Sequence, residues 1–527
     1  MPVERRSNAG WDEVNWQQRC KNLMNMPTNM PTGRRIAVPQ RFSPLGPADQ
    51  LSAIAWQITA VILSGFWNLS GKAAEPSPQT LVPKIASVWI LQEPANSDRS
   101  NPTPVGGLSD LFLTRQRTLP GNPAATTGPR ELWAITDRGP NATTDSSSGK
   151  RRTLLMPRFT PAMVRIGNGD AWLGSTSQAS TTHTPPTIQP LIVPVTSIVP
   201  LTTHDGQPLS GRPNGIGKDE PILDAASLEP VATDPNGIDP EGLVVLSNGT
   251  RWIAEEYRPS LLEVSSAGCL VGRFVPQGQA IKGAGAPVHE VFPRAYASRR
   301  DNRGFEAMAL SMDESRLFVM LQSPLENPRP QSAAKTGNVR LLVFDTALRR
   351  PVAEYLYRLG DPSHRNYLTR GAPPKDGKLP AMSAIDSETL IVVEQADDGL
   401  ARLYQISLSR ATNTLGHTAP LEKQSLEEVR NLQREGIVPV SKTLIADLEP
   451  LLPAMAEHIA GSAAGEKADA PKLEGIVILN ERQIAIINDN DFAASKRPIV
   501  PAGAQSRNCL WLIDLPRPLA ALVSPVE

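Results

Sequence analysis

The chain of 527 residues carries 53 basic and 53 acidic side chains, so its formal net charge at pH 7 is zero. That balance argues against a nucleic-acid-binding protein, which normally shows a basic excess or a basic stripe. With 51 prolines and 38 glycines the backbone is interrupted often, which favours many short strands over long helices. The three cysteines, Cys20, Cys269 and Cys509, form no CxxC pair, which excludes zinc-ribbon and thioredoxin-type motifs. Cys269 and Cys509 either pair with each other or remain separate thiols.

A targeting signal is the first element along the chain, after a disordered extension expected over residues 1–50. Arg35 and Arg41 precede an apolar run, Leu51–Leu69, and small residues follow it. This order is typical of a secretory signal, and the run is also about long enough to span a bilayer. Residues 51–74 are therefore expected to be a cleaved signal peptide or an uncleaved membrane anchor, with a buried helix as the remaining alternative. The first two interpretations predict a body that is secreted, periplasmic or part of the cell envelope, and that touches a membrane only through this segment.

Short strands are expected throughout the remaining domain, residues 81–520. Apolar runs such as Leu243–Leu246, Arg316–Leu321 and Ile476–Leu479 are bounded by Gly, Pro, Asn and Asp, which is typical of strands. Many such runs at close spacing predict a sandwich, a barrel or a propeller. Three polar or Pro-, Gly- and Ala-rich segments cannot contribute to a core and are expected to be loop insertions: Gly174–Pro186, Pro324–Gly337 and Ile459–Pro471.

A degenerate repeat organises these strands into similar units. Asp239–Gly242 leads through two strands to Glu255–Tyr257, and Lys472–Gly475 leads in the same way to Asn488–Asp491. A hairpin of two short strands fits this spacing of about 14 residues, and its start and end then lie at the same end of the hairpin. Arranged radially, the units would direct their acidic side chains to one opening of a central channel. The predicted fold class is all-β and β-propeller-like, with six or seven blades and irregular loop insertions. Related units begin at Val105, Asn302 and Ser383.

Taken in order over about Ile85 to Leu515, the motifs resemble the phytase-like family, described by its esterase-like activity of phytase. The resemblance implies a propeller-like fold and hydrolysis of phosphate esters. The sequence departs from the family pattern where Ala307 follows Glu306 in place of glycine, and in its long insertions. The motifs that carry the resemblance are Thr136–Asn141, Asp239–Gly242, Ala254–Tyr257, Asn302–Glu306, Gln322–Leu325, Leu473–Gly475 and Asn488–Phe492.

Metal binding is the chemistry that the repeated acids predict. Clustered carboxylates repel one another and persist only where a cation or a proton compensates them. Clusters made only of oxygen ligands suit hard cations, Ca²⁺ first and Mg²⁺ second. A bound Ca²⁺ would polarise a phosphate group and activate a water molecule. The candidate ligands are Asp137, Glu241, Glu255, Glu306, Glu474, Asn488 and Asp489.

The arginines beside these acids are expected to clamp phosphate oxygens, since a guanidinium group can bind them through two hydrogen bonds. Arg303 is alternatively expected to pair with Glu306 or another acid. The candidate catalytic residues are Asp137, Arg138, Glu241, Arg303, Glu306 and Glu474.

Each motif also has a structural interpretation. Asp137–Pro140 can form a turn with an internal ion pair, and Asn488–Asp491 can form an Asx-rich turn. Glu241 and Glu474 can serve to hydrogen-bond neighbouring blade loops. Either Glu255 or Glu256 is expected to point outward into solvent, because adjacent strand residues point in opposite directions.

The expected function follows from what is present and what is missing. The sequence contains no GxSxG elbow, HExxH motif, P-loop or Rossmann fingerprint, and its six histidines lie outside the repeated motifs. Metal-assisted hydrolysis of a small phosphate ester by an exported enzyme is therefore the leading hypothesis. The first alternative is a non-catalytic envelope propeller that binds a ligand or protein and uses calcium only structurally. A sugar- or lactone-processing propeller enzyme is a third hypothesis.

Overall fold

The computed structural model describes most of the chain from Leu81 to Ala520. The described residues are 81–92, 105–114, 117–119, 122–127, 130–146, 149–154, 158–167, 188–215, 222–224, 227, 229–360, 376–396, 399–416, 425–460, 471–493 and 506–520. The expected extension, the targeting segment 51–74 and the insertion Gly174–Pro186 lie outside these residues. None of the helices in the described ranges is both long and apolar enough to cross a membrane.

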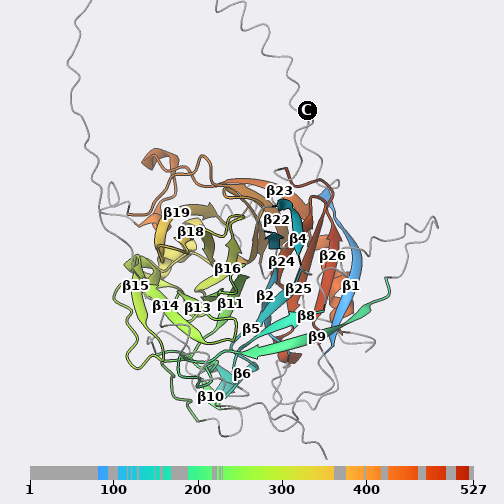
Figure 1. The fold of residues 1–527 in the computed structure, drawn as a ribbon. Coiled ribbons are helices and arrows are strands. Elements are labelled where there is room, and N and C mark those ends of the chain that lie inside the picture. The colour runs from blue at the N-terminus through green and yellow to red at the C-terminus, as the bar shows by residue number, and fades with distance from the viewer. Residues whose placement is uncertain are drawn as a thin grey trace, which may run out of the picture. The chain divides into compact units, whose positions relative to one another are not determined.

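Five blades form the body of the structure (Figure 1). One eight-stranded sheet contributes two of them, and sheets of five, four and four strands contribute the other three. The first blade consists of β2 (Leu108–Leu113), β5 (Leu132–Thr136), β8 (Ala162–Ile166) and β9 (Leu191–Pro200). The second consists of β11 (Pro240–Val245), β12 (Arg251–Glu255), β13 (Ser260–Val264) and β14 (Leu270–Pro276), with β15 (Val288–Phe292) added in parallel. The third consists of β16 (Phe305–Leu310), β17 (Arg316–Leu321), β18 (Asn338–Asp345) and β19 (Arg350–Arg358).

The last two blades complete the ring. The fourth consists of β20 (Lys378–Ala384), β21 (Thr389–Gln395), β22 (Ala401–Ser407) and β23 (Ser441–Asp447). The fifth consists of β24 (Lys472–Asn480), β25 (Gln483–Asp489), β26 (Cys509–Asp514) and β1 (Lys84–Gln92). Because β1 precedes all the blades in sequence yet pairs with β26, the two ends of the domain are joined within one sheet. β1 also pairs in parallel with β9, which links the fifth blade to the first.

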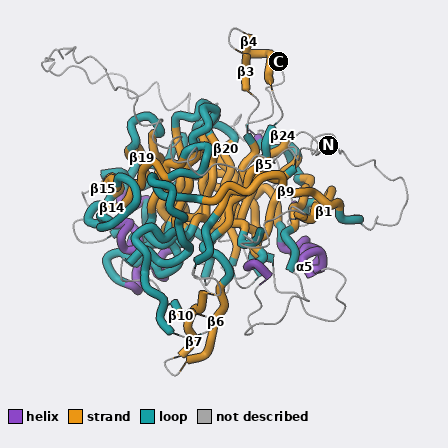
Figure 2. Tube along the Cα trace, turned by 60° about the horizontal axis from the view of Figure 1, so that its bottom comes forward, coloured by secondary structure: helices purple, strands orange, loops and turns teal. Residues whose placement is uncertain are grey.

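The innermost strands β2, β11, β16, β20 and β24 contact one another in that order, and β24 returns to β2. The all-β, propeller-like fold is thereby confirmed, but the expected six or seven blades are wrong, since the described strands close a ring of five. The expected number of blades was too high because part of the chain forms segments between the blades and small additional sheets. These are β3 (Arg117–Leu119) with β4 (Asn122–Thr127), and β6 (Asn141–Ser146) with β7 (Gly149–Leu154) and β10 (Leu223–Asp224). Figure 2 shows both small sheets standing apart from the blades.

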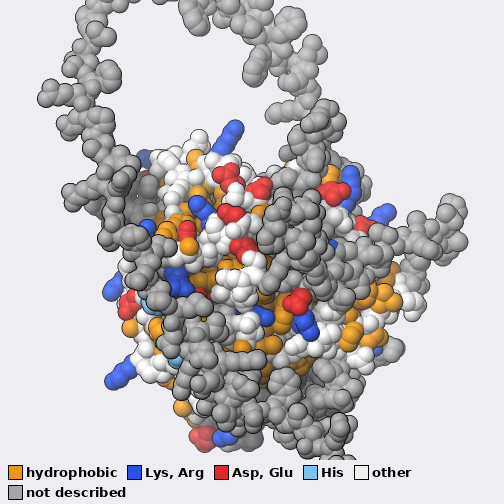
Figure 3. All heavy atoms as spheres, viewed as in Figure 1, with side chains coloured by type: hydrophobic (Ala, Val, Ile, Leu, Met, Phe, Trp, Pro, Cys, Tyr) orange, Lys and Arg blue, Asp and Glu red, His pale blue; other side chains and the backbone are white. Residues whose placement is uncertain are grey.

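The hydrophobic core lies between the faces of adjacent blades. Between the second and third blades, Trp252 and Phe274 of one blade pack on Phe344 of the other, with ring centroids 5.3 and 5.5 Å apart. Other buried clusters join the fourth blade to the fifth, the fifth to the first and the first to the second. Cys509 lies in the first of these clusters as a buried free thiol, so it forms no disulfide with Cys269. On the face viewed in Figure 3, acidic and basic side chains are interspersed.

Close approach of the innermost strands explains why glycine follows the first acid of two units. A Cβ atom on Gly475 would lie 2.5 Å from the backbone nitrogen of Leu111 in the neighbouring blade. A Cβ atom on Gly242 would lie 2.8 Å from the Cβ of Met308. Cβ atoms in proteins essentially never approach another heavy atom within 3.0 Å, so neither position can carry a side chain unless the blades move apart.

Replacing Gly475 with alanine should therefore lower the free energy of unfolding by about 1–3 kcal/mol, the usual cost of overpacking a core. Urea unfolding monitored by circular dichroism measures the change. Gly272→Ala in β14 is the matched control, because its Cβ would meet no atom closer than 3.6 Å. Equal stability losses in the two variants would contradict the close-approach explanation.

Candidate functional site

A β-bulge at the beginning of each innermost strand builds the site. The pairing register shifts at Leu108/Asp110, Pro240/Gly242, Phe305/Met308, Lys378/Ala381 and Leu473/Gly475. In the second, third and fifth blades the bulge holds a glutamate, namely Glu241, Glu306 and Glu474. A bulge turns its side chain out of the regular alternation of a strand. The same backbone irregularity therefore presents a carboxylate from three blades of the ring.

The end of the second strand lies beside each bulge. Leu108 pairs with Thr136, Pro240 with Glu255, and Lys472 with Asp489. The expectation that the start and end of a unit lie at the same end of its hairpin is thus confirmed. Further acids are added there, because Asp137 follows β5, Glu256 follows β12 and Asp489 ends β25.

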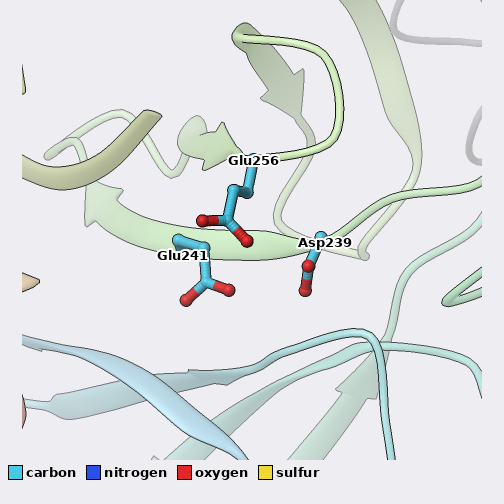
Figure 4. Close-up of side chains that lie close together, drawn as sticks. All are labelled: Asp239, Glu241 and Glu256. Atoms are coloured by element: carbon cyan, nitrogen blue, oxygen red, sulfur yellow. The ribbon is translucent and has the colours of Figure 1, made fainter. Parts of the chain in front are cut away.

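Three carboxylates of the second blade form the tightest group. One carboxylate oxygen from each of Asp239, Glu241 and Glu256 lies within 4.8 Å of the other two, as Figure 4 illustrates. Asp239 and Glu256 are buried, whereas Glu241 is partly exposed. Three like charges at this spacing require compensation by protons or cations.

Arg138 compensates one side of this group. Its Nη1 donates to Asp239 and to the side-chain oxygen of Asn302, and lies 3.8 Å from Glu256. Its backbone nitrogen donates to the other oxygen of Asp239 at 3.0 Å. The expectation of an ion pair within the turn Asp137–Pro140 is therefore wrong, because Arg138 pairs instead with an acid of the next blade.

Three other carboxylate oxygens are buried without any hydrogen-bond partner among the described residues. They belong to Glu256 (Oε1), Glu306 (Oε2) and Glu474 (Oε2). The second oxygen of Glu306 accepts a hydrogen bond from Gln322, and that of Glu474 accepts one from Lys378 at 3.2 Å. A buried acceptor that lacks a donor costs about 1–3 kcal/mol, and more when it is charged. Such oxygens are suited to coordinating a cation.

Burial and mutual repulsion raise the pKa values of these acids. Burial is the largest cause of the raised pKa of both Glu241 and Glu306. The next cause at Glu241 is repulsion from Glu306. At Glu306 it is repulsion from Glu256 and Glu474. Both pKa values lie well above the ordinary range. Burial and repulsion from Asp239 raise the pKa of Glu256 to about 7, although Arg138 and two further arginines oppose the shift. The bulge glutamates thus act on one another across three blades.

A second acidic group lies where the fifth blade meets the first. Burial and repulsion from Asp489 raise the pKa of Asp137. Asp489 has a pKa raised to about 6 by burial, and Lys472 lies 3.1 Å from it. Lys472 also pairs with Asp491, so this group carries its own cation. Asp137 accepts a hydrogen bond from the backbone of Gly139 at 2.7 Å, as expected for a turn.

Glu255 and Asn488 lie beside the acidic groups, but their side-chain oxygens are engaged within the protein. Glu255 accepts hydrogen bonds from the backbones of Tyr257 and Arg258 and from Ser260, at 2.8–3.1 Å. Asn488 accepts from the backbone of Cys509 at 2.7 Å and bridges β25 to β26. Their oxygens already have donors, so both residues fit a structural role better than the predicted ligand role.

Two other expectations differ from the structure. One of Glu255 and Glu256 was expected to point into solvent, but both are buried, at 0% and 1% exposure. The alternation of a strand does not apply to this pair, because β12 ends at Glu255. Arg303 pairs with no acid among the described residues, and its Nη1 is buried without a hydrogen-bond partner.

The sequence interpretation placed Gln322 in a motif of the resemblance but gave it no site role, missed Lys378 and aligned the fourth unit incorrectly. Ser383 was expected to begin that unit, but it lies near the end of β20, whose bulge follows Lys378. Because no acid occupies this bulge, the acidic signal used to find the other units was missing. The spacing of the bulge before the second strand would have located it.

The fold and the site define a five-bladed propeller with carboxylates gathered at the start of its inner strands. The phytase-like family, described by its esterase-like activity of phytase, matches residues 103–492, and the chain belongs to this family. A relative from Arthroderma benhamiae, named an uncharacterized secreted protein, is 23% identical over 288 residues, 48% of this chain and 54% of the relative. The chain thus spans about half the length of the curated relative it matches.

Solved structures with similar folds share little sequence with the chain. The WD40 repeats of RRP9 are 9% identical, with 82% of this chain and 99% of that chain covered and a TM-score of 0.29. Virginiamycin B lyase from Staphylococcus aureus is 10% identical, with 72% and 98% covered and a TM-score of 0.23.

The raised pKa of Glu256 predicts how the stability of the metal-free protein changes with pH. The folded state keeps the Glu256 proton up to pH of about 7, whereas the unfolded chain releases it near its ordinary pKa of 4.5. The contribution of Glu256 to the free energy of unfolding is therefore most favourable to the folded state below about pH 4.5, and it decreases as the pH rises to about 7.

Glu256→Gln should flatten this fall, because it removes the titrating group and its repulsion of Glu306. Urea unfolding in chelator at several pH values measures the slope. Glu388→Gln is the control, since Glu388 is exposed at the turn after β20. An unchanged slope in Glu256→Gln would show that Glu256 titrates normally in the folded protein.

Proposed function

We propose that this protein is an exported, metal-dependent hydrolase of phosphate esters, with its site at the carboxylate-lined channel mouth. The supporting observation is the set of buried carboxylate oxygens without partners on Glu256, Glu306 and Glu474, which come from three different blades. Export is supported by the relative named as secreted and by the signal-like segment 51–74.

Calcium is the cation that this set of donors fits best. Glu256, Glu306 and Glu474 would hold it through their buried oxygens that lack partners, together with Glu241, which has an oxygen within 4.8 Å of Glu256. All four offer only oxygen ligands. Asp239 is less suited, since Arg138 already occupies both of its oxygens. A bound Ca²⁺ would supply Lewis-acid polarisation of a phosphoryl oxygen and lower the pKa of water.

The protein's own residues have distinct tasks in this proposal. Gln322 and Lys378 each bond one oxygen of a bulge glutamate and so leave its other oxygen in a fixed direction. Asp137 and Asp489 lie at the edge of the site and extend its negative field toward the first blade. A small phosphate ester is the expected substrate, since the family is described by an esterase-like activity of phytase.

Removal of calcium should abolish hydrolysis. With a chelator in excess, turnover of phosphomonoesters and inositol phosphates should fall to background, and added Ca²⁺ should restore it. Glu241→Gln and Glu474→Gln should each lower activity and reduce the rise in melting temperature that Ca²⁺ produces, because binding to the folded state stabilises it. Glu388→Gln, exposed at the turn after β20 and outside every bulge, should behave as the wild type.

The outcomes separate this proposal from the non-catalytic alternative. Full turnover in excess chelator would overturn metal dependence. Calcium-dependent stabilisation without hydrolysis of any phosphomonoester, inositol phosphate or carboxyl ester would favour a binding propeller with structural calcium.

A further inference from the structure

The loop that precedes β16 carries three arginines beside the acidic mouth, and each has a different environment. Arg299 is fully buried, and its Nε donates to the carbonyl of Tyr257 at 2.5 Å. Arg300 lies 3.6 Å from Asp376, and both side chains are partly exposed. Arg303 is partly buried, and its Nη1 is enclosed without a hydrogen-bond partner among the described residues. Only the third guanidinium therefore has a buried donor left unused in this loop.

The backbone of the loop is fixed against Glu256. A Cβ atom on Gly304 would lie 2.0 Å from the carbonyl oxygen of Glu256, so the two segments are in direct contact. Asn302 adopts a left-handed conformation with φ of 53°, which asparagine tolerates, and its side chain accepts a hydrogen bond from Arg138. The backbone nitrogen of Arg303 donates to the carbonyl of Arg300 at 3.2 Å. Arg303 is thus held near the carboxylate site before any ligand arrives.

Arg138 and Arg303 differ in whether their guanidinium groups already pair with an acid of the protein. Arg138 also has one buried nitrogen without a partner, its Nε, but its Nη1 bonds Asp239, which has no exposed surface. Removing that guanidinium would leave a buried carboxylate unpaired, so its role within the protein is to hold Asp239. The charge of Arg303 reaches Glu256 and lowers its pKa, yet Arg303 forms no ion pair with it. Its buried donor is available to a ligand.

We propose that Arg303 binds the phosphoryl group of the ligand through its free Nη1, whereas Arg138 is a positioning residue that contacts only protein. An unused buried N–H group costs free energy that a ligand acceptor recovers. The guanidinium fork matches the oxygens of a phosphoryl group better than an ammonium does. The inference rests on the proposed function insofar as it takes the channel mouth as the ligand site.

Binding of inorganic phosphate to the full chain tests the assignment without requiring turnover. Isothermal titration in dilute Ca²⁺, below the concentration at which calcium phosphate precipitates, should show binding to the wild type. Arg303→Met should weaken it at least about tenfold, as expected for loss of one charge-assisted hydrogen bond. Arg303→Lys should recover part of the affinity, because it restores charge without the fork. Arg300→Met, on the same loop, should bind like the wild type.

The Ca²⁺-induced melting shift, measured on the same variants, should be retained in Arg303→Met. Arg138→Met should instead lower the melting temperature of the protein without ligand. Phosphate affinity unchanged in Arg303→Met, or no phosphate binding to the wild type, would overturn the assignment. Phosphate binding that depends on Arg303, together with no hydrolysis of any phosphate ester, would uphold the assignment and reject the proposed hydrolase.

Discussion

Repulsion among carboxylates that the fold brings together is the interaction on which the candidate site depends. Asp239, Glu241 and Glu256 lie within 4.8 Å, and Glu306 and Glu474 extend the group across two more blades. The protein compensates part of this charge itself, with Arg138 on Asp239 and Lys378 on Glu474. The oxygens left over are buried and without partners among the described residues, and they are the ones that the proposed cation would neutralise.

The packing of the blades and the chemistry of the mouth share one structural origin. Each inner strand begins with a bulge, and in the second and fifth blades the same bulge both presents a glutamate and brings the following residue against the next blade. Gly242 and Gly475 satisfy that close approach by having no side chain. In the third blade Ala307 takes the same place and is buried at 1% exposure, so the ring tolerates one methyl group there. The departure from the Glu-Gly pattern thus alters packing and leaves Glu306 at its bulge.

Much of the site was predictable because hairpin geometry is local. The spacing between Glu241 and Glu255 requires two short strands and a tight turn, and this places both ends together regardless of the rest of the fold. The sequence could not distinguish Glu255 from Glu256, since both are buried and only their hydrogen-bond partners separate a structural acid from a site acid. The number of blades was also not predictable from chain length, because polar strands outside the blades, such as β6 and β7, add residues that belong to no blade.

The sequence by itself determined the class of fold, the hairpin units and the presence of repeated acids at their ends. These features follow from local periodicity and turn chemistry, which act between residues close in the chain. The tertiary structure alone decided which acids meet, which basic side chain pairs with each of them and which hydrogen-bond donors stay without a partner. Arg138 illustrates the difference, because it adjoins Asp137 in sequence yet bonds Asp239, 101 residues away in the next blade. Such pairings depend on how separate blades are placed around the ring, and that placement is set by packing between residues distant in the chain.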